Sequence, residues 1–238
     1  MAIVFILVEF LYFLISSYLL FYLPGNLFFK IFKIKLDFPA DIFLKVLTGI
    51  TFFTLTMYSL SWAHLQLAIY PVLLATLFFS VKKRIISLPK IPREHRKAAI
   101  FVLVLSFIFS LQMILNGNFG NSIYTFGDDM AHLGYISELK HAFPPQHPGF
   151  SGIPLRGYHF FADFVTAMVS NTTGLSFLTL YFHLIPLLVA LGWGLGGYTI
   201  LYLWTKKVNA GILGAFLLLF GSSFSYILFS LRFNKSQF

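Results

Sequence analysis

The chain is made of long apolar runs that are interrupted only by short polar segments. A run of about 20 apolar residues, coiled as an α-helix, matches the ~30 Å hydrocarbon core of a bilayer. Hydrophobic residues make up 58% of the chain and charged residues 11%, against roughly 25% in a soluble domain. The mean hydropathy is +0.82. The sequence therefore predicts an all-α protein, a polytopic bundle of about six transmembrane helices.

Prolines, glycines and charges mark where the apolar runs end. The first run reaches Pro24-Gly25, and we expect its helix to stop there because proline breaks helices. The run GWGLGG at 192–197 would let the helix that contains it approach a neighbour closely. The expected spans are 2–23, 41–61, 65–81, 98–116, 175–204 and 209–231, with a tight turn at 62–64.

Basic residues predict how these spans are oriented. The loop 82–97 contains seven Lys/Arg and one Glu, so the positive-inside rule places it in the cytoplasm. The next span then leads outward, which makes the loop 117–172 extracytoplasmic. Within that loop, 158–172 is a short helix candidate containing Asp163, and we expect one or two such helices to lie at the interface. If 158–172 instead crossed the bilayer, Lys206-Lys207 would face outside.

The net charge of the chain can be explained by the orientation of its membrane spans. The net charge is +9, but most basic residues sit in short loops between spans, and no nucleic-acid partner is predicted. The loop 82–97 would instead attract anionic lipid headgroups. We divide the sequence into an N-terminal three-span segment, 1–97, which ends in the basic loop, and a candidate catalytic membrane region, 98–238, which carries four of the eight acids and five of the seven histidines. The chain ends just after a span, so we expect a longer natural protein, with this chain truncated at its C-terminus.

Titratable residues gather in one stretch, 128–163, which reads DDMAHLGYISELKHAFPPQHPGFSGIPLRGYHFFAD. Four of the chain's eight acids and four of its seven histidines lie in it. A membrane protein that concentrates such groups in one loop is expected to carry its chemistry there. The residues are Asp128, Asp129, His132, Glu138, His141, His147, His159 and Asp163.

Two i, i+4 pairs carry the interpretation: Asp128 with His132, and His159 with Asp163. Residues at this spacing share a helix face. Carboxylates and imidazoles that converge could bind a divalent metal such as Mg²⁺ or Mn²⁺, with His132 and Asp163 as ligands, or could move a proton. Structural roles fit the same spacing, with Asp128 as a helix N-cap and the Tyr-His-Phe-Phe segment as an interface anchor.

Arg156 is the one arginine in this stretch. Its planar guanidinium matches the oxygens of a phosphate, and so it is a candidate for binding a phosphorylated substrate. Arginine is also common at membrane interfaces, where a lipid headgroup would be its partner.

The order of these features resembles the C-type superfamily of polytopic membrane glycosyltransferases, which includes protein mannosyltransferases and aminoarabinose transferases. An outward-leading span precedes an external loop with an Asp-Asp motif, and further membrane helices follow. The segments GDDMAHL, PPQHP and LRGYHFFADF look like an uncharacterised prokaryotic branch, and the resemblance covers roughly residues 98–205. It implies an enzyme of the cell membrane that transfers a sugar from a polyprenyl-phosphate donor to an acceptor hydroxyl outside the cytoplasm.

The resemblance also implies roles for particular residues. Asp128 or Asp129 would be the base that deprotonates the acceptor hydroxyl. Arg156, Tyr158 and His159 would bind the substrate, and either Arg156 or a metal would stabilise the leaving lipid phosphate. Two other functions are compatible with the sequence: a transporter or lipid flippase, and a non-catalytic subunit of an envelope assembly.

Overall fold

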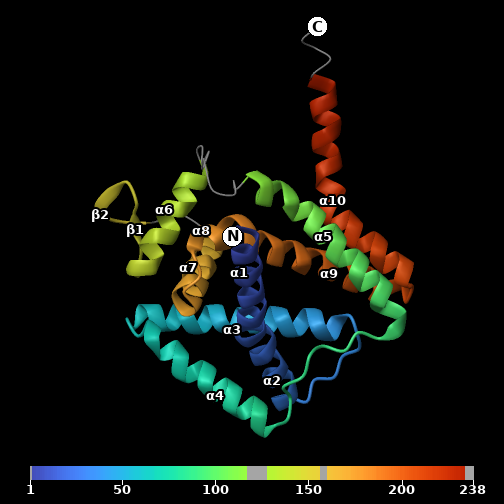
Figure 1. Ribbon diagram of the computed structural model, residues 1–238, viewed down its shortest axis with the longest axis horizontal. Helices are drawn as coiled ribbons and strands as arrows, with labels where there is room; N and C mark the ends of the chain where they lie inside the picture. The colour runs from blue at the N-terminus through green and yellow to red at the C-terminus, as the bar shows by residue number, and fades with distance from the viewer. Residues whose placement is uncertain (1, 117–127, 156–159, 234–238) are drawn as a thin grey trace. The chain divides into compact units, whose positions relative to one another are not determined.

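The computed structural model of the chain describes residues 2–116, 128–155 and 160–233. Nearly all of its regular structure is helical (Figure 1). Among the described residues, three helices are long and apolar enough to cross a membrane: Val8–Ile31, Ala40–Trp62 and Phe177–Thr205. The predicted all-α class is confirmed, and these three helices are candidates for membrane spans, while a total of about six spans stays a prediction.

The chain forms two compact units, and their residues interleave along the sequence. Unit 1 comprises Met1–Lys35, Leu44–Leu88 and Gly117–Ile185. Unit 2 comprises Leu36–Phe43, Pro89–Asn116 and Pro186–Phe238. The acid and histidine stretch belongs to the same unit as the N-terminal helices, and the division of the sequence at residue 97 stays a prediction.

The first helix of unit 1 continues through Pro24-Gly25, so the prediction that it ends there is wrong. It consists of α1 (Ala2–Ser17), a π-helical turn η1 (Tyr18–Tyr22) and α2 (Leu23–Ile31). A wide turn just before a proline makes room for its ring, which would clash with a carbonyl of a regular helix. The same arrangement recurs where η4 (Leu180–Leu184) precedes Pro186. Gly25 packs directly against the backbone of Lys45, where any side chain would collide.

The second and third predicted spans correspond to observed helices. They are α3 (Ala40–Trp62) and α4 (Ile69–Lys82), the latter preceded by a short 3₁₀ helix η2 (Gln66–Ala68). The expected turn between them is present, with His64 in the left-handed conformation at φ 55°.

The remainder of unit 1 carries the polar stretch. It consists of α6 (Asp128–His141), a hairpin of β1 (Gln146–His147) and β2 (Phe150–Pro154), α7 (Phe161–Thr173) and α8 (Phe177–Thr179), followed by η4. The 13 residues of α7 are too few to span a bilayer. Residues 163–170 of α7 are all buried by protein, so this helix is a core element of unit 1 rather than an exposed amphipathic helix.

Unit 2 contains a helical layer formed by η3 (Arg93–His95), α5 (Arg96–Asn116), α9 (Ile185–Thr205) and α10 (Val208–Phe233). Near the start of α5, Ala98 packs with Tyr198 of α9 and Ala215 of α10. Farther along α5, Leu105 packs with Ala190 and Leu219. The residue numbers rise together in α5 and α10 and fall in α9. Hence α5 and α10 run parallel, and α9 runs in the opposite direction.

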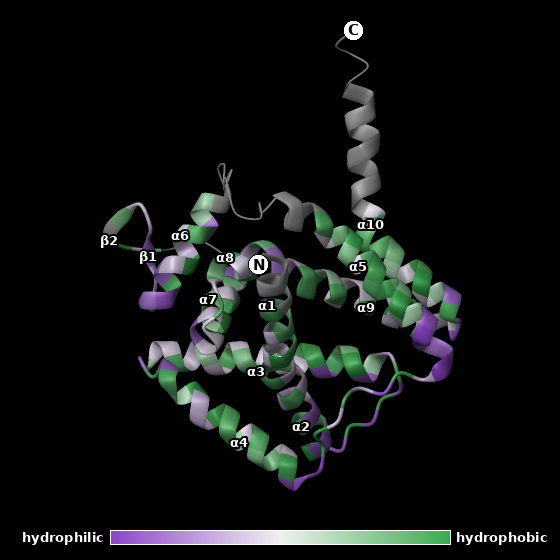
Figure 2. Cartoon of the chain, viewed as in Figure 1, coloured by the Kyte–Doolittle hydropathy of each residue, from purple (hydrophilic) through white to green (hydrophobic). Residues whose placement is uncertain are grey.

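This arrangement brings two basic segments of unit 2 to one end of it. The segment before α5 and the Lys206-Lys207 turn between α9 and α10 both lie there, and Figure 2 shows hydrophilic colour at this end and hydrophobic colour along the helices. The predicted close contact of the 192–197 run is confirmed. Gly197 meets the backbone of Gly214, and Gly194 lies against Ser106 and Val102.

Candidate functional site

A histidine and an aspartate from different helices form a hydrogen-bonded pair in unit 1. His132, in the second turn of α6, lies with Nδ1 2.9 Å and 3.0 Å from the two carboxylate oxygens of Asp163, in the first turn of α7. The Asp163 side chain is 2% exposed, whereas that of His132 is 26% exposed. The carboxylate is therefore enclosed by protein, and the imidazole has one side open.

This geometry determines the tautomer of the His132 ring. An ionised carboxylate only accepts hydrogen bonds, so Nδ1 of His132 carries the proton that it donates to Asp163. Nε2 is then the nitrogen that can accept a proton, donate one when the ring is charged, or bind a metal. A carboxylate on Nδ1 fixes both the ring orientation and its tautomer, as in histidine-based catalytic sites and zinc sites.

Aromatic side chains stand around the exposed imidazole. The ring of Tyr135 lies 6.4 Å from that of His132 at 89°, and the ring of Tyr181 lies 6.1 Å away at 30°. Tyr181 belongs to η4, and such π turns are common at functional sites. Neither tyrosine could be predicted as a site residue, because nothing in the sequence links positions 135 and 181 to His132.

Packing beneath the pair holds α6 and α7 in place. Ile136 and Leu139 of α6 are almost fully buried. Next to Asp163, Phe164 packs edge-on against Tyr58 of α3 and against Phe143, with ring centroids 5.9 Å and 5.6 Å away. A pair built on such a core keeps its geometry without depending on the loops around it.

Hydrogen bonds at the far end of α7 complete this support. Tyr12 of α1 donates from its hydroxyl to the carbonyl of Thr173 at 2.9 Å. Asn171 donates from Nδ2 to the carbonyl of Lys140, the penultimate residue of α6, at 3.0 Å. The Asn171–Lys140 hydrogen bond and the His132–Asp163 pair therefore tie α6 to α7 at two separated points. The hydrogen bond from Tyr12 ties α7 to α1.

The structure brings some of the predicted site residues together and leaves others outside its description. Asp128 and Asp129 form the beginning of α6, one helical turn before His132, but their side chains are not among those described. Arg156, Tyr158 and His159 lie outside the described residues. The sequence suggested pairing within each helix, whereas the observed pair joins α6 to α7.

The described residues do not by themselves make a metal site. Among them, no group of three or more His, Cys, Asp or Glu side chains is placed to hold an ion. Asp163 is bonded to Nδ1 of His132, so it orients the imidazole instead of facing an ion beside it. The prediction of Mg²⁺ or Mn²⁺ stays a prediction, and no step proposed below depends on one.

A buried histidine in unit 2, His95, serves as a comparison. His95 is 1% exposed, and its Nδ1 lies 2.6 Å from the hydroxyl of Tyr198. The rings of Phe38 and Tyr202 each lie 4.7 Å from the imidazole. Nε2 lies 3.4 Å from the carboxylate of Glu94, a residue whose side chain is 70% exposed. Both ring nitrogens of His95 therefore have partners, and protein encloses the ring.

Comparisons with known proteins add no functional assignment. No family model matches the chain, and neither a curated protein nor a solved structure is similar enough to match it. The resemblance to C-type glycosyltransferases thus depends on the short motifs in the sequence alone. What the site can do must be argued from its own residues.

Proposed function

We propose that this chain is part of an integral membrane glycosyltransferase, which moves a sugar from a polyprenyl-phosphate donor to an acceptor hydroxyl at the extracytoplasmic face. The observation that carries the proposal is the His132–Asp163 pair, anchored on a rigid core one helical turn from the Asp128-Asp129 acids. Acids and an oriented imidazole can serve as the proton-transfer and charge-stabilising groups of such a reaction.

The reaction assigns a role to each group. The acceptor oxygen attacks the anomeric carbon of the sugar, and a new carbon–oxygen bond forms there. The bond from that carbon to the phosphate oxygen breaks, and its electron pair leaves with the lipid phosphate. The carboxylate of Asp128 or Asp129 takes the hydroxyl proton, because a hydroxyl is a poor nucleophile until it is deprotonated. Such general-base assistance supplies roughly 10²–10⁴-fold in rate.

His132 is assigned to the leaving phosphate. When its ring is protonated, Nε2 can donate a hydrogen bond to a phosphate oxygen, and the buried Asp163 carboxylate balances the positive charge. The transition state gains negative charge on that oxygen, so a donor fixed in advance stabilises it more than it stabilises the bound donor substrate. Arg156, Tyr158 and His159 are proposed to bind the phosphate and the sugar.

The proposed side of the membrane follows from charge and topology. The basic segment before α5 and Lys206-Lys207 lie at the same end of unit 2, as expected if both are cytoplasmic and α7 does not cross the bilayer. This arrangement supports an extracytoplasmic position for the site.

No observation specifically favours either of the two rival functions, a transporter or a non-catalytic subunit. A transport path along the glycines of α9 would need open space, but Gly194 and Gly197 are filled by neighbouring helices. A purely structural subunit would not need a partly exposed imidazole that is fixed by a buried acid.

The direct test is sugar transfer by the purified membrane protein. Labelled mannosyl and aminoarabinosyl polyprenyl phosphates are suitable donors, and the label is followed into an acceptor. We expect transfer by the wild-type protein and a loss of roughly 10²-fold or more in the double variant Asp128→Asn/Asp129→Asn. His147→Gln is the matched control, since His147 lies on the hairpin and contacts Phe150 rather than the pair. Equal transfer by wild type and double variant would refute the catalytic assignment.

A further inference from the structure

An open groove in unit 2 lies along the segment that leads into α5. It has a volume of about 760 Å³ and is lined by residues of 89–96 and the first two turns of α5. Three of the lining side chains are cationic, namely Lys90, Arg93 and Arg96, and no acidic side chain lines the groove. A groove of this size can hold the headgroup of an amphiphile together with part of its chain.

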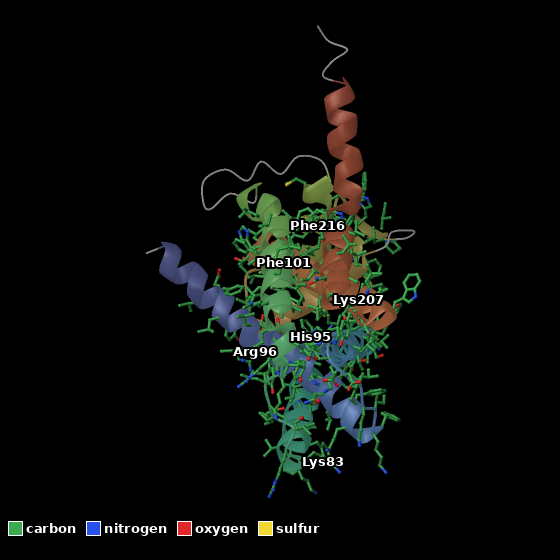
Figure 3. The ribbon with its side chains drawn as sticks, turned by 90° about the vertical axis from the view of Figure 1, so that its right-hand side faces the viewer. Lys83, His95, Arg96, Phe101, Lys207 and Phe216 are labelled. Atoms are coloured by element: carbon green, nitrogen blue, oxygen red, sulfur yellow. The ribbon has the colours of Figure 1, made fainter. Side chains whose placement is uncertain are left out.

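The groove changes from basic to apolar along α5. Arg96 is the first residue of the helix, and Ile100 and Leu103 follow at a spacing that places all three on one face. Figure 3 shows Arg96 at the start of α5 and Phe101 farther along the helix. Ile100 and Leu103 are 63% and 53% exposed, so this face offers an uncovered apolar track that begins at the cationic end.

The cations of the groove have no protein partner within the described part of the chain. Neither Lys90, Arg93 nor Arg96 forms an ion pair or a side-chain hydrogen bond there. The acid nearest in sequence, Glu94, points instead to the buried His95. Arg93 and Arg96 also sit at the helix N-terminus, where positive charge is unfavourable. The positive-inside rule explains basic residues in this loop but does not explain their convergence on one groove.

We propose that this groove is a binding site for an anionic phospholipid of the leaflet that faces the basic loop. The phosphate of the headgroup would lie among Lys90, Arg93 and Arg96, and one acyl chain would follow Ile100 and Leu103. Charge complementarity selects an anionic headgroup. The apolar track begins at the cations, so an acyl chain joined to the bound phosphate can follow it, and a free phosphate ion makes no use of it.

Photo-cross-linking on the full chain in lipid nanodiscs tests this site. The probe is phosphatidylglycerol with a photoreactive group in one acyl chain, compared with phosphatidylcholine that carries the same chain. We expect the anionic probe to label the 98–107 region of α5 and the zwitterionic probe to label it much less. Removing two cations with Arg93→Gln/Arg96→Gln should weaken the anionic labelling roughly tenfold.

The matched control removes two charges from the same loop but outside the groove. Lys82→Gln/Lys83→Gln should leave labelling unchanged, and it also reports whether loss of loop charge alone alters insertion. A charge-neutral variant, Ile100→Ala/Leu103→Ala, should lower acyl-chain labelling while retaining the preference for the anionic headgroup.

Three results would overturn the proposal. The first is equal labelling by the two lipids, and the second is wild-type labelling in the Arg93→Gln/Arg96→Gln variant. The third is full competition by water-soluble glycerophosphoglycerol, which would indicate a site for a free phosphate ester instead of a membrane lipid.

Discussion

Two histidine pairs in the described part of the chain, His132–Asp163 and His95–Tyr198, use the same kind of side chain for opposite purposes. His132 in unit 1 is held through Nδ1 by a buried carboxylate, and a quarter of its side chain is exposed. His95 in unit 2 is bonded to a tyrosine hydroxyl and enclosed by aromatic rings. An enclosed imidazole with two partners can only stabilise the fold. An oriented imidazole that is partly exposed can also react.

The largest expected effect is a loss of sugar transfer, and we expect it only when the His132–Asp163 pair is changed. His132→Gln keeps an amide that can donate to Asp163 but removes the titratable ring, so we expect sugar transfer to fall by roughly 10³-fold. The free energy of unfolding should change little, because the buried carboxylate retains a donor. Initial rates and denaturant titrations in mixed micelles measure both quantities. A variant with wild-type rate would remove His132 from the reaction.

The second effect is a lower free energy of unfolding, and we expect it when the His95–Tyr198 pair is changed. His95→Ala removes a buried ring from an aromatic cage and leaves the hydroxyl of Tyr198 without its partner. We expect a loss of about 3 kcal/mol in the free energy of unfolding, from the cavity and the unpaired hydroxyl together. The transfer rate per folded molecule should stay near that of the wild type. A stable variant with lost activity would reverse the comparison.

A third test asks whether His132 and Asp163 act as one unit. Asp163→Asn should lower transfer by roughly 10²-fold, because a neutral amide fixes the tautomer less well and does not balance a charged ring. Combined with His132→Gln, the losses should not add, and the double variant should be about as slow as His132→Gln alone. Fully additive losses would mean that the observed hydrogen bond is not used in the reaction.

How far the sequence predicts these features depends on the kind of signal. Helices α3, α5 and α10, and the continuous helix Phe177–Thr205 that ends with α9, were predicted within a few residues, because apolar length and loop charge are local properties. The path through Pro24 was not predicted, since a π turn two residues before a proline leaves no mark in composition.

For the candidate site, too, the sequence predicted local features but not tertiary contacts. Clustering of acids and histidines predicted where His132 and Asp163 belong, but their spacing of 31 residues could not predict that they pair. Which helix faces bury each other is a tertiary property, and here it depends on how α7 is enclosed by α6 and α3. His95 was not singled out at all, because it appears in the sequence as one more residue of a basic loop.

The smallest expected effect tests the hydrogen bond that encloses His95. Tyr198→Phe keeps the ring but removes the hydroxyl 2.6 Å from Nδ1, so we expect a loss of about 1 kcal/mol in the free energy of unfolding. Tyr202→Phe is the matched control. Its ring packs on the same imidazole, but among the described residues its hydroxyl forms no hydrogen bond, and its removal should cost much less. Equal losses in the two variants would mean that ring packing, and not the hydrogen bond, holds His95 in place.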